Sequence, residues 1–145
     1  MSNLKYFFTL HLALLSIAGI GNAAATAPYP SHAIRWVVPY PPGGTTDILA
    51  RIVGARLAER LGQHVVIDNR AGAGNNIGTE IVVKAPPDGY TVLLVNPANA
   101  INATLYQNLN FDFLRDVAPV GGLVRVPNVM EITVSLPAKS VAEFI

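Results

Sequence analysis

The sequence predicts an α/β fold in which a parallel sheet carries helices on both faces. Three observations support this prediction. Short runs of apolar, β-branched residues recur along the chain, helix-like segments alternate with them, and glycine-rich loops follow the first two runs. Hydrophobic residues make up 51% of the 145 residues and charged residues only 13%, so there is enough apolar material for a core. We find no internal repeat and no low-complexity linker.

The first predicted elements follow one another closely. Residues 34–38 (IRWVV) form a continuous apolar run that is typical of a buried parallel strand. Residues 48–61 are expected to form a helix, because Leu49, Ile52, Val53, Leu57 and Leu61 fall on one stripe and a glycine follows as a stop signal. Residues 64–67 are the second predicted strand.

The remaining elements are weaker in pattern. A short helix is expected through Ile77, Ile81 and Val82, and the PPDG turn at residues 86–89 ends it. The rest comprises a third strand at 90–95, a helix at 98–106, and two further strands at 117–124 and 129–134.

The sequence SVAE at residues 140–143 has the spacing of a capping box, in which the hydroxyl and the carboxylate each bind an amide of the helix start. Because the chain stops one turn later, we expect a truncated protein.

The amino end predicts export. Lys5 is followed by an apolar stretch from Tyr6 to Ile20, and Ala23-Ala24-Ala25 fits a cleavage site, so residues 1–25 are expected to be a cleavable signal peptide. The expected location is the periplasm. A retained membrane anchor is the alternative, but the absence of cysteine excludes a lipoprotein anchor at this site.

The stretch PYPPGGTTD at residues 39–47 joins the first strand to the first helix. In open parallel sheets, ligands bind beyond the carboxyl ends of the strands, where loops lead into helix amino ends. The prolines stiffen the loop, Gly43-Gly44 lets a ligand approach the main chain, and the free amides of the helix start favour an anion. Thr45 and Thr46 can supply a helix cap and hydroxyl donors. A capped turn without a ligand, in which Asp47 pairs with Arg51, explains the same residues.

Two further polar loops are expected at the same edge of the sheet. The glycines at 72, 74 and 78 have the spacing Gly-x-Gly-x-x-x-Gly, a poor match to a dinucleotide fingerprint. Asn96 follows the third strand and is a candidate ligand-binding residue. Three such loops would form one wall of a cleft. A nucleotide- or dinucleotide-binding enzyme domain that uses the Gly72–Gly78 loop remains the alternative, and a structural remnant without activity is a third possibility.

Residues for catalysis are scarce. The chain has no cysteine and no Gly-x-Ser-x-Gly elbow, and His32 and His64 precede strands at the opposite edge of the sheet. No residues show metal-ligand spacing. After residue 25 there are nine Lys/Arg and nine Asp/Glu without basic runs, which argues against nucleic acid as a partner. The sequence therefore predicts a binding protein that is not an enzyme and uses no cofactor.

Four segments, taken in order, resemble the tripartite tricarboxylate transporter substrate-binding proteins, also called the Bug family. They are IRWVVPYPPGGTTDILARIV, LGQHVVIDNRAGAGNNIGTE, PPDGYTVLLV and LPAKSVAEFI. The resemblance runs from about Tyr29 to Ile145. It implies a periplasmic-binding-protein-like (type II) fold and a two-lobed receptor that delivers a small carboxylate to the membrane components of a transporter. Residues 26–125 would form an incomplete first lobe, and residues 126–145 the crossover into a second lobe that is largely missing.

The resemblance also implies ligand-binding residues in the first two loops. In the first loop they are Tyr40, Pro41, Pro42, Gly43, Gly44, Thr45, Thr46 and Asp47, and in the second they are Gly72, Gly74, Asn76, Ile77 and Gly78. Arg70 is either a further ligand contact or a solvated loop charge. The sequence departs from the family pattern at Asn75, at Glu131 and at residues 133–134.

Overall fold

A computed structural model describes residues 28–127 and 129–145, so the predicted signal peptide lies outside the described residues. Its centre is a three-stranded parallel sheet in the order β2-β1-β3. The strands are β1 (Ile34–Val38), β2 (Val65–Asn69) and β3 (Thr91–Leu93). In register, Trp36 of β1 lies opposite Ile67 of β2 and Val92 of β3.

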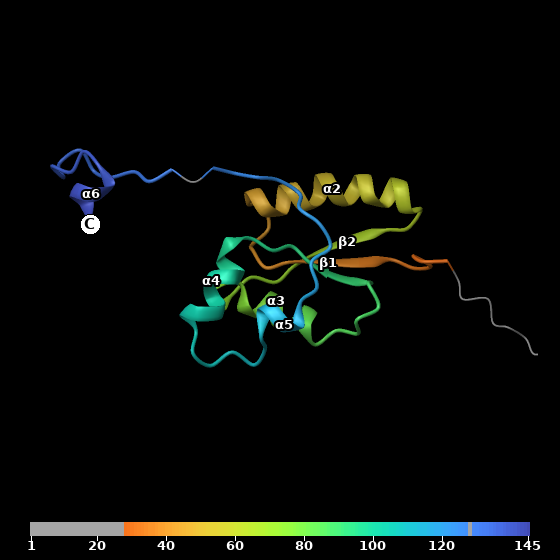
Figure 1. Cartoon of the computed structure of the whole chain (residues 1–145). Coiled ribbons are helices and arrows are strands. Elements are labelled where there is room, and N and C mark those ends of the chain that lie inside the picture. The colour runs from red at the N-terminus through yellow and green to blue at the C-terminus, as the bar shows by residue number, and fades with distance from the viewer. Residues whose placement is uncertain (1–27, 128) are drawn as a thin grey trace, which may run out of the picture.

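Helices cover both faces of this sheet. Helix α2 (Thr45–Leu61) connects β1 to β2 and lies along one face (Figure 1). The opposite side carries α3 (Asn76–Val83), α4 (Pro97–Leu105) and the short α5 (Phe113–Asp116) (Figure 1). The predicted parallel α/β fold with helices on both faces is therefore confirmed. None of the described helices is long and apolar enough to cross a membrane.

The core lies between β1 and α2. Trp36, Val38, Ala50 and Leu94 form a buried apolar cluster. Small residues of α2 allow the close approach, since a Cβ atom at Gly54 would lie 3.2 Å from Cδ1 of Ile67. Because successive side chains of a strand point to opposite faces, Trp36 and Val38 lie on the α2 face and Val37, between them, faces away from it.

The apolar stripe expected for α2 is wrong in part. Ile52 is 62% exposed, and Leu57 and Leu61 are also exposed, whereas Ala50 and Gly54 are buried. The sheet contacts α2 where its side chains are smallest, because small residues let helix and sheet pack at close range. Apolar periodicity identified the helix correctly but not the face that it buries.

Element boundaries moved by only a few residues. Helix α2 begins at Thr45, three positions before the predicted start. β2 extends to Asn69, while β3 is limited to three residues. The predicted strand at 34–38 and the helices near 77–82 and 98–106 are confirmed.

The two strands predicted at 117–124 and 129–134 do not form in the described residues. Val120 is 93% exposed and Val134 is fully exposed, and neither segment pairs with the sheet. A strand needs a neighbouring strand for its backbone N–H and C=O groups. β-branched residues supply the propensity but not that partner, so these segments remain without regular structure.

The carboxyl-terminal helix α6 (Val141–Phe144) starts at its predicted cap. The hydroxyl of Ser140 accepts a hydrogen bond from the N–H of Glu143 at 3.3 Å, which confirms one half of the capping box. The carboxylate of Glu143 instead accepts from the N–H of Lys139 at 2.7 Å, one residue earlier than the motif requires.

The strand order positions the loops. Because β1 lies between β2 and β3, the chain leaves β1 toward the α2 face and leaves β3 toward the face that carries α4 (Figure 1). The carboxyl ends of β1 and β3 therefore form a topological switch point, where open α/β sheets bind ligands.

Candidate ligand-binding site

The hydroxyl of Tyr40 lies where the three carboxyl-end loops meet. Tyr40 follows β1 and is partly buried. The side-chain amide of Asn75, from the 3₁₀ turn η1 (Ala73–Asn75), donates to the hydroxyl oxygen at 2.6 Å. The side-chain amide of Asn96, just after β3, donates to the same oxygen. The structure thus brings together two predicted site residues, Tyr40 and Asn96, and adds Asn75, which the sequence marked only as a departure from the family pattern.

Asn96 also starts helix α4. Its Oδ1 accepts from the N–H of Ala98 at 2.9 Å, and Oδ1 of Asn99 accepts from the N–H of Asn96 at 3.0 Å. This reciprocal pattern is a capping box, which satisfies amides that the helix itself leaves free. Because Oδ1 of Asn96 binds the helix, its Nδ2 is the atom that faces Tyr40.

A buried polar network fixes the second loop against α4. Oγ1 of Thr79 donates to the carbonyl of Asn75 at 3.0 Å and accepts from Nδ2 of Asn99 at 2.9 Å. Nδ2 of Asn102 donates to Oδ1 of Asn76 at 3.1 Å. Buried polar groups need such partners, so these bonds hold the loop in one arrangement. Sequence reasoning missed Thr79, Asn99 and Asn102, although asparagines at 96, 99 and 102 recur with helical spacing.

Asp47 holds the first loop onto the start of α2. Its side chain is buried, and its Oδ2 accepts from the N–H of Gly43 at 2.8 Å and from Nε of Arg51 at 3.0 Å. Oδ1 lies 2.9 Å from Nη2 of Arg51, which confirms the predicted ion pair. The hydrogen bond from Arg51, followed by that from Gly43, lowers the pKa of Asp47 to about 2. Both carboxylate oxygens thus face groups of the loop and its helix.

The first turn of α2 carries no side-chain cap. Gly44 occupies the cap position, and no side chain of the described residues accepts a bond from the helix start there. The cap predicted from Thr45 or Thr46 is therefore wrong, because the helix begins at Thr45 and both residues lie within its first turn. Pro41 to Thr45 are exposed to solvent. Gly43 has φ of +83°, a conformation that favours glycine and turns the chain into the helix.

The predicted residues of the second loop divide into two groups. Gly72, Gly74 and Ile77 are exposed, whereas Asn76 and Gly78 are buried. A Cβ atom at Gly78 would lie 2.8 Å from Cβ of Pro39 and 2.9 Å from the carbonyl oxygen of Arg70, so only glycine lets α3 pack against the end of β1. Gly78 therefore supports the loop through close packing against the end of β1, while Gly72 and Gly74 lie on the surface of the loop.

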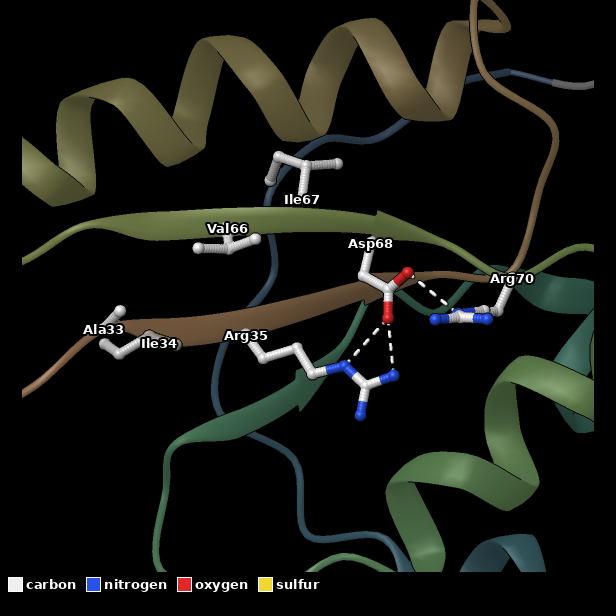
Figure 2. Close-up of a pocket in the computed structure, with 7 residues that line it drawn as sticks. All are labelled: Ala33, Ile34, Arg35, Val66, Ile67, Asp68 and Arg70. Carbon is white, nitrogen blue, oxygen red and sulfur yellow. Dashed lines mark hydrogen bonds and ion pairs between the residues drawn. The ribbon is translucent and has the colours of Figure 1, made fainter.

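A hollow of about 370 Å³ lies elsewhere, on the face of β1 and β2 away from α2. Figure 2 shows that Arg35 and Arg70 both point at Asp68 across this hollow. The Nε atom of each arginine lies 2.8 Å from an oxygen of the Asp68 carboxylate. Burial acts to raise the pKa of Asp68, but the bonds from Arg35 and Arg70 outweigh it and lower the pKa overall. Arg70 is thus paired within the protein. Apart from Arg70, the hollow contains no candidate residue of the three loops.

The two histidines lie at the opposite edge, as predicted. His32 precedes β1 and stacks on the ring of Tyr90, with ring centroids 3.6 Å apart, and His64 precedes β2. In residues 28–127 and 129–145, no three His, Cys, Asp or Glu side chains are grouped so that they could hold a metal ion.

Comparison with known proteins finds one family. The family model described as tripartite tricarboxylate transporter family receptor matches residues 49–145. BugT of Bordetella pertussis is 40% identical over 118 residues, which cover 80% of this chain and 36% of BugT. A UPF0065 protein from the tcbD-tcbE intergenic region of Pseudomonas sp. strain P51 is 39% identical over 124 residues, which cover 80% of this chain and 37% of that protein.

Solved structures agree with the fold. Rpa4515 of R. palustris, solved with adipate, superposes with a TM-score of 0.64 at 44% identity, covering 80% of this chain and 39% of that one. MatC (Rpa3494) from Rhodopseudomonas palustris, with bound malate, gives a TM-score of 0.62 at 33% identity, covering 66% and 33%. The periplasmic binding protein BugD gives 0.58 at 38% identity, covering 61% and 29%. These neighbours confirm the predicted periplasmic-binding-protein-like lobe, and the chain spans less than two fifths of each.

Proposed function

The chain belongs to the tripartite tricarboxylate transporter receptor family, and we propose that it forms the first lobe of a periplasmic receptor for a small carboxylate. The similar solved structures are solute-binding proteins rather than enzymes, and two of them hold adipate and malate. One observation carries the proposal. Three loops converge on the Tyr40 hydroxyl at the switch point of the sheet, next to the uncapped start of α2.

The loops at the carboxyl ends of the strands can bind an anion through neutral hydrogen-bond donors. Gly44 and Thr45 are exposed and Thr46 is half-buried, and their amides and hydroxyls lie at the positive end of the α2 dipole. Nearby positive side chains are already paired, Arg51 with Asp47 and Arg70 with Asp68. We assign ligand contacts to the exposed loop residues, and we assign to Asp47 and Gly78 the support of the loops.

The free energy that the first loop can contribute is too small for micromolar binding, so this proposal requires a second lobe. A charge at a helix amino end gains about 0.3–2 kcal/mol, whereas micromolar binding needs about 8 kcal/mol. The rest has to come from further hydrogen bonds and exclusion of water by a facing lobe. In this proposal residues 26–125 belong to the first lobe, residues 126–145 to the crossover, and residues 1–25 to the export signal. The full receptor would deliver its solute to the membrane components of the transporter.

Chemical-shift titration of the 145-residue chain with malate and adipate tests the proposal. We expect shifts of the Gly43, Gly44 and Thr45 amides, with weak affinity near about 1 mM because one lobe acts alone. The neutral diamide of adipic acid is the matched control and should shift them less. Shifts confined to the hollow at Arg35, or shifts of the Gly72–Gly78 amides by NAD with none by either carboxylate, would overturn it.

A further inference from the structure

We infer that Asn75 is a positioning residue that, together with Asn96, turns the Tyr40 hydroxyl into a hydrogen-bond donor for the ligand. This inference rests on the proposed function. It concerns one hydroxyl and the two amides that donate to it, and it predicts that this hydroxyl donates to an acceptor atom of the ligand.

The hydroxyl oxygen of Tyr40 receives two donors. A tyrosine hydroxyl offers one O–H donor and accepts through its oxygen, whereas an amide nitrogen only donates. Nδ2 of Asn75 and Nδ2 of Asn96 both bind this oxygen. Within the described residues, Tyr40 Oη donates no hydrogen bond in return. Its proton is therefore left for a group outside the protein.

Other bonds of Asn75 and Asn96 hold these two side chains beside the hydroxyl. Oδ1 of Asn96 is bound to the N–H of Ala98, so reversing the amide would lose the cap of α4. The backbone N–H of Asn75 donates to the carbonyl of Gly72 at 3.0 Å, and its carbonyl accepts from Thr79. Both backbone groups of Asn75 are thus fixed, and its side chain, 6% exposed, has little freedom to turn away.

The backbone of Asn75 shows that its side chain has a separate role. Asn75 has φ of +85°, where asparagine is tolerated but glycine is favoured. Glycine would meet this backbone requirement without a buried amide. What asparagine adds at this position is its hydrogen bond to Tyr40.

A ligand can reach the hydroxyl that results. Tyr40 is only partly buried, and the segments on either side of it, Pro41–Gly44 and Gly72–Gly74, are exposed. A hydroxyl held as a donor favours an acceptor such as a carboxylate oxygen and disfavours a group that only donates, such as an ammonium. The site therefore selects an acceptor at this position through two residues that need not touch the ligand.

A double-mutant cycle tests the inference. Affinity for malate and adipate is measured by chemical-shift titration for the unmodified chain, Tyr40→Phe, Asn75→Gly and the double variant. We expect Tyr40→Phe to weaken binding about tenfold and Asn75→Gly about threefold to tenfold. In the Tyr40→Phe background, Asn75→Gly should have no further effect, because its action passes through the hydroxyl.

A further variant separates orientation from packing. Asn75→Asp keeps the size of the side chain but offers the Tyr40 proton an acceptor, so it should weaken binding more than Asn75→Gly, and this difference should shrink in the Tyr40→Phe background. Asn108→Gly, at an exposed loop position, is the control and should bind like the unmodified chain. Thermal unfolding of each variant shows that it is folded.

The results of these titrations distinguish a failure of this inference from a failure of the proposed function. If the unmodified chain shows no shifts with either carboxylate, the proposed function fails. If the unmodified chain binds and Asn75→Gly binds equally well, or if the effects of the two single variants multiply, only the role of Asn75 is overturned.

Discussion

Asp47 is a charged residue that lies next to the proposed anion site and is bound by groups of the protein itself. Its carboxylate is buried and binds the amide of Gly43 and the guanidinium of Arg51. The loop conformation that exposes the first amides of α2 therefore depends on the ionised form of Asp47.

This dependence predicts an acid-sensitive first loop. The pKa of Asp47 is lowered from 3.8 to about 2, so its stabilising contribution is complete above pH 3.8 and is lost as the pH falls toward 2. Asp47→Asn should flatten the pH dependence of unfolding in that range and destabilise the protein at neutral pH. Urea unfolding between pH 2 and pH 7 measures this, with Glu59→Gln, an exposed carboxylate, as the control. Parallel pH profiles for the unmodified chain and Asp47→Asn would contradict it.

Gly44 tests whether the ligand approaches the main chain. A Cβ atom there would meet only the carbonyl of Pro41, at 3.8 Å, so the fold has room for a side chain. Gly44→Val should therefore leave the protein folded and abolish carboxylate binding, because the valine would cover the first amides of α2. Titration with adipate measures the affinity, and Gly122→Val, at a glycine with nothing within 4 Å, is the control. Unchanged affinity would show that the ligand does not approach this loop.

At the scale of elements, α3 and α4 act as the support for the second loop. Asn96 caps α4, and Asn99 and Asn102 reach from that helix to Thr79 and to the loop around Asn76. The helices and the loop thus share one hydrogen-bond network, and the position of Asn75 beside Tyr40 follows from it.

The packing of α3 against β1 is most sensitive to added side-chain volume at Gly78. Gly78→Ala should destabilise the protein by about 1–3 kcal/mol, because the added methyl group would overlap Pro39 and the carbonyl of Arg70. Chemical denaturation measures the change, and Gly121→Ala, in open space, is the matched control. If both variants unfold alike, α3 does not depend on close contact with the end of β1.

At the scale of the whole molecule, the described chain consists of a packed sheet region and an exposed carboxyl-terminal segment. Helix α6 lies well away from the sheet, and residues 121–127 and 129–137 are exposed (Figure 1). The apolar side chains of this segment contribute little to the core shown by Trp36 and Val38.

Removing that segment should therefore leave the sheet region intact. We expect deletion of residues 121–145 to change the free energy of unfolding by less than about 0.5 kcal/mol, since the deleted residues are almost all exposed. Deletion of residues 97–145, which also removes α4 and its buried amides, should instead unfold the second loop. Circular dichroism with thermal melting distinguishes the two, and a large loss of stability in the shorter deletion would contradict the expectation.

The sequence by itself determined the local elements and the kind of protein. Continuous apolar runs marked β1 and β2, helical spacing and a terminal glycine marked α2, and the order of four motifs indicated the family. These signals are readable because they depend on residues that are close in the chain.

The tertiary structure decided which side chains meet. Tyr40 joins residues 35 and 56 positions away, a fact that no local pattern contains. It also decided that the small residues of α2 face the sheet and that Gly44 rather than a threonine occupies the cap position of that helix. It decided too that the described residues after residue 116 form no strand. Pairing partners, burial and hydrogen bonds between loops depend on contacts distant in sequence, and these exist only once the chain has folded.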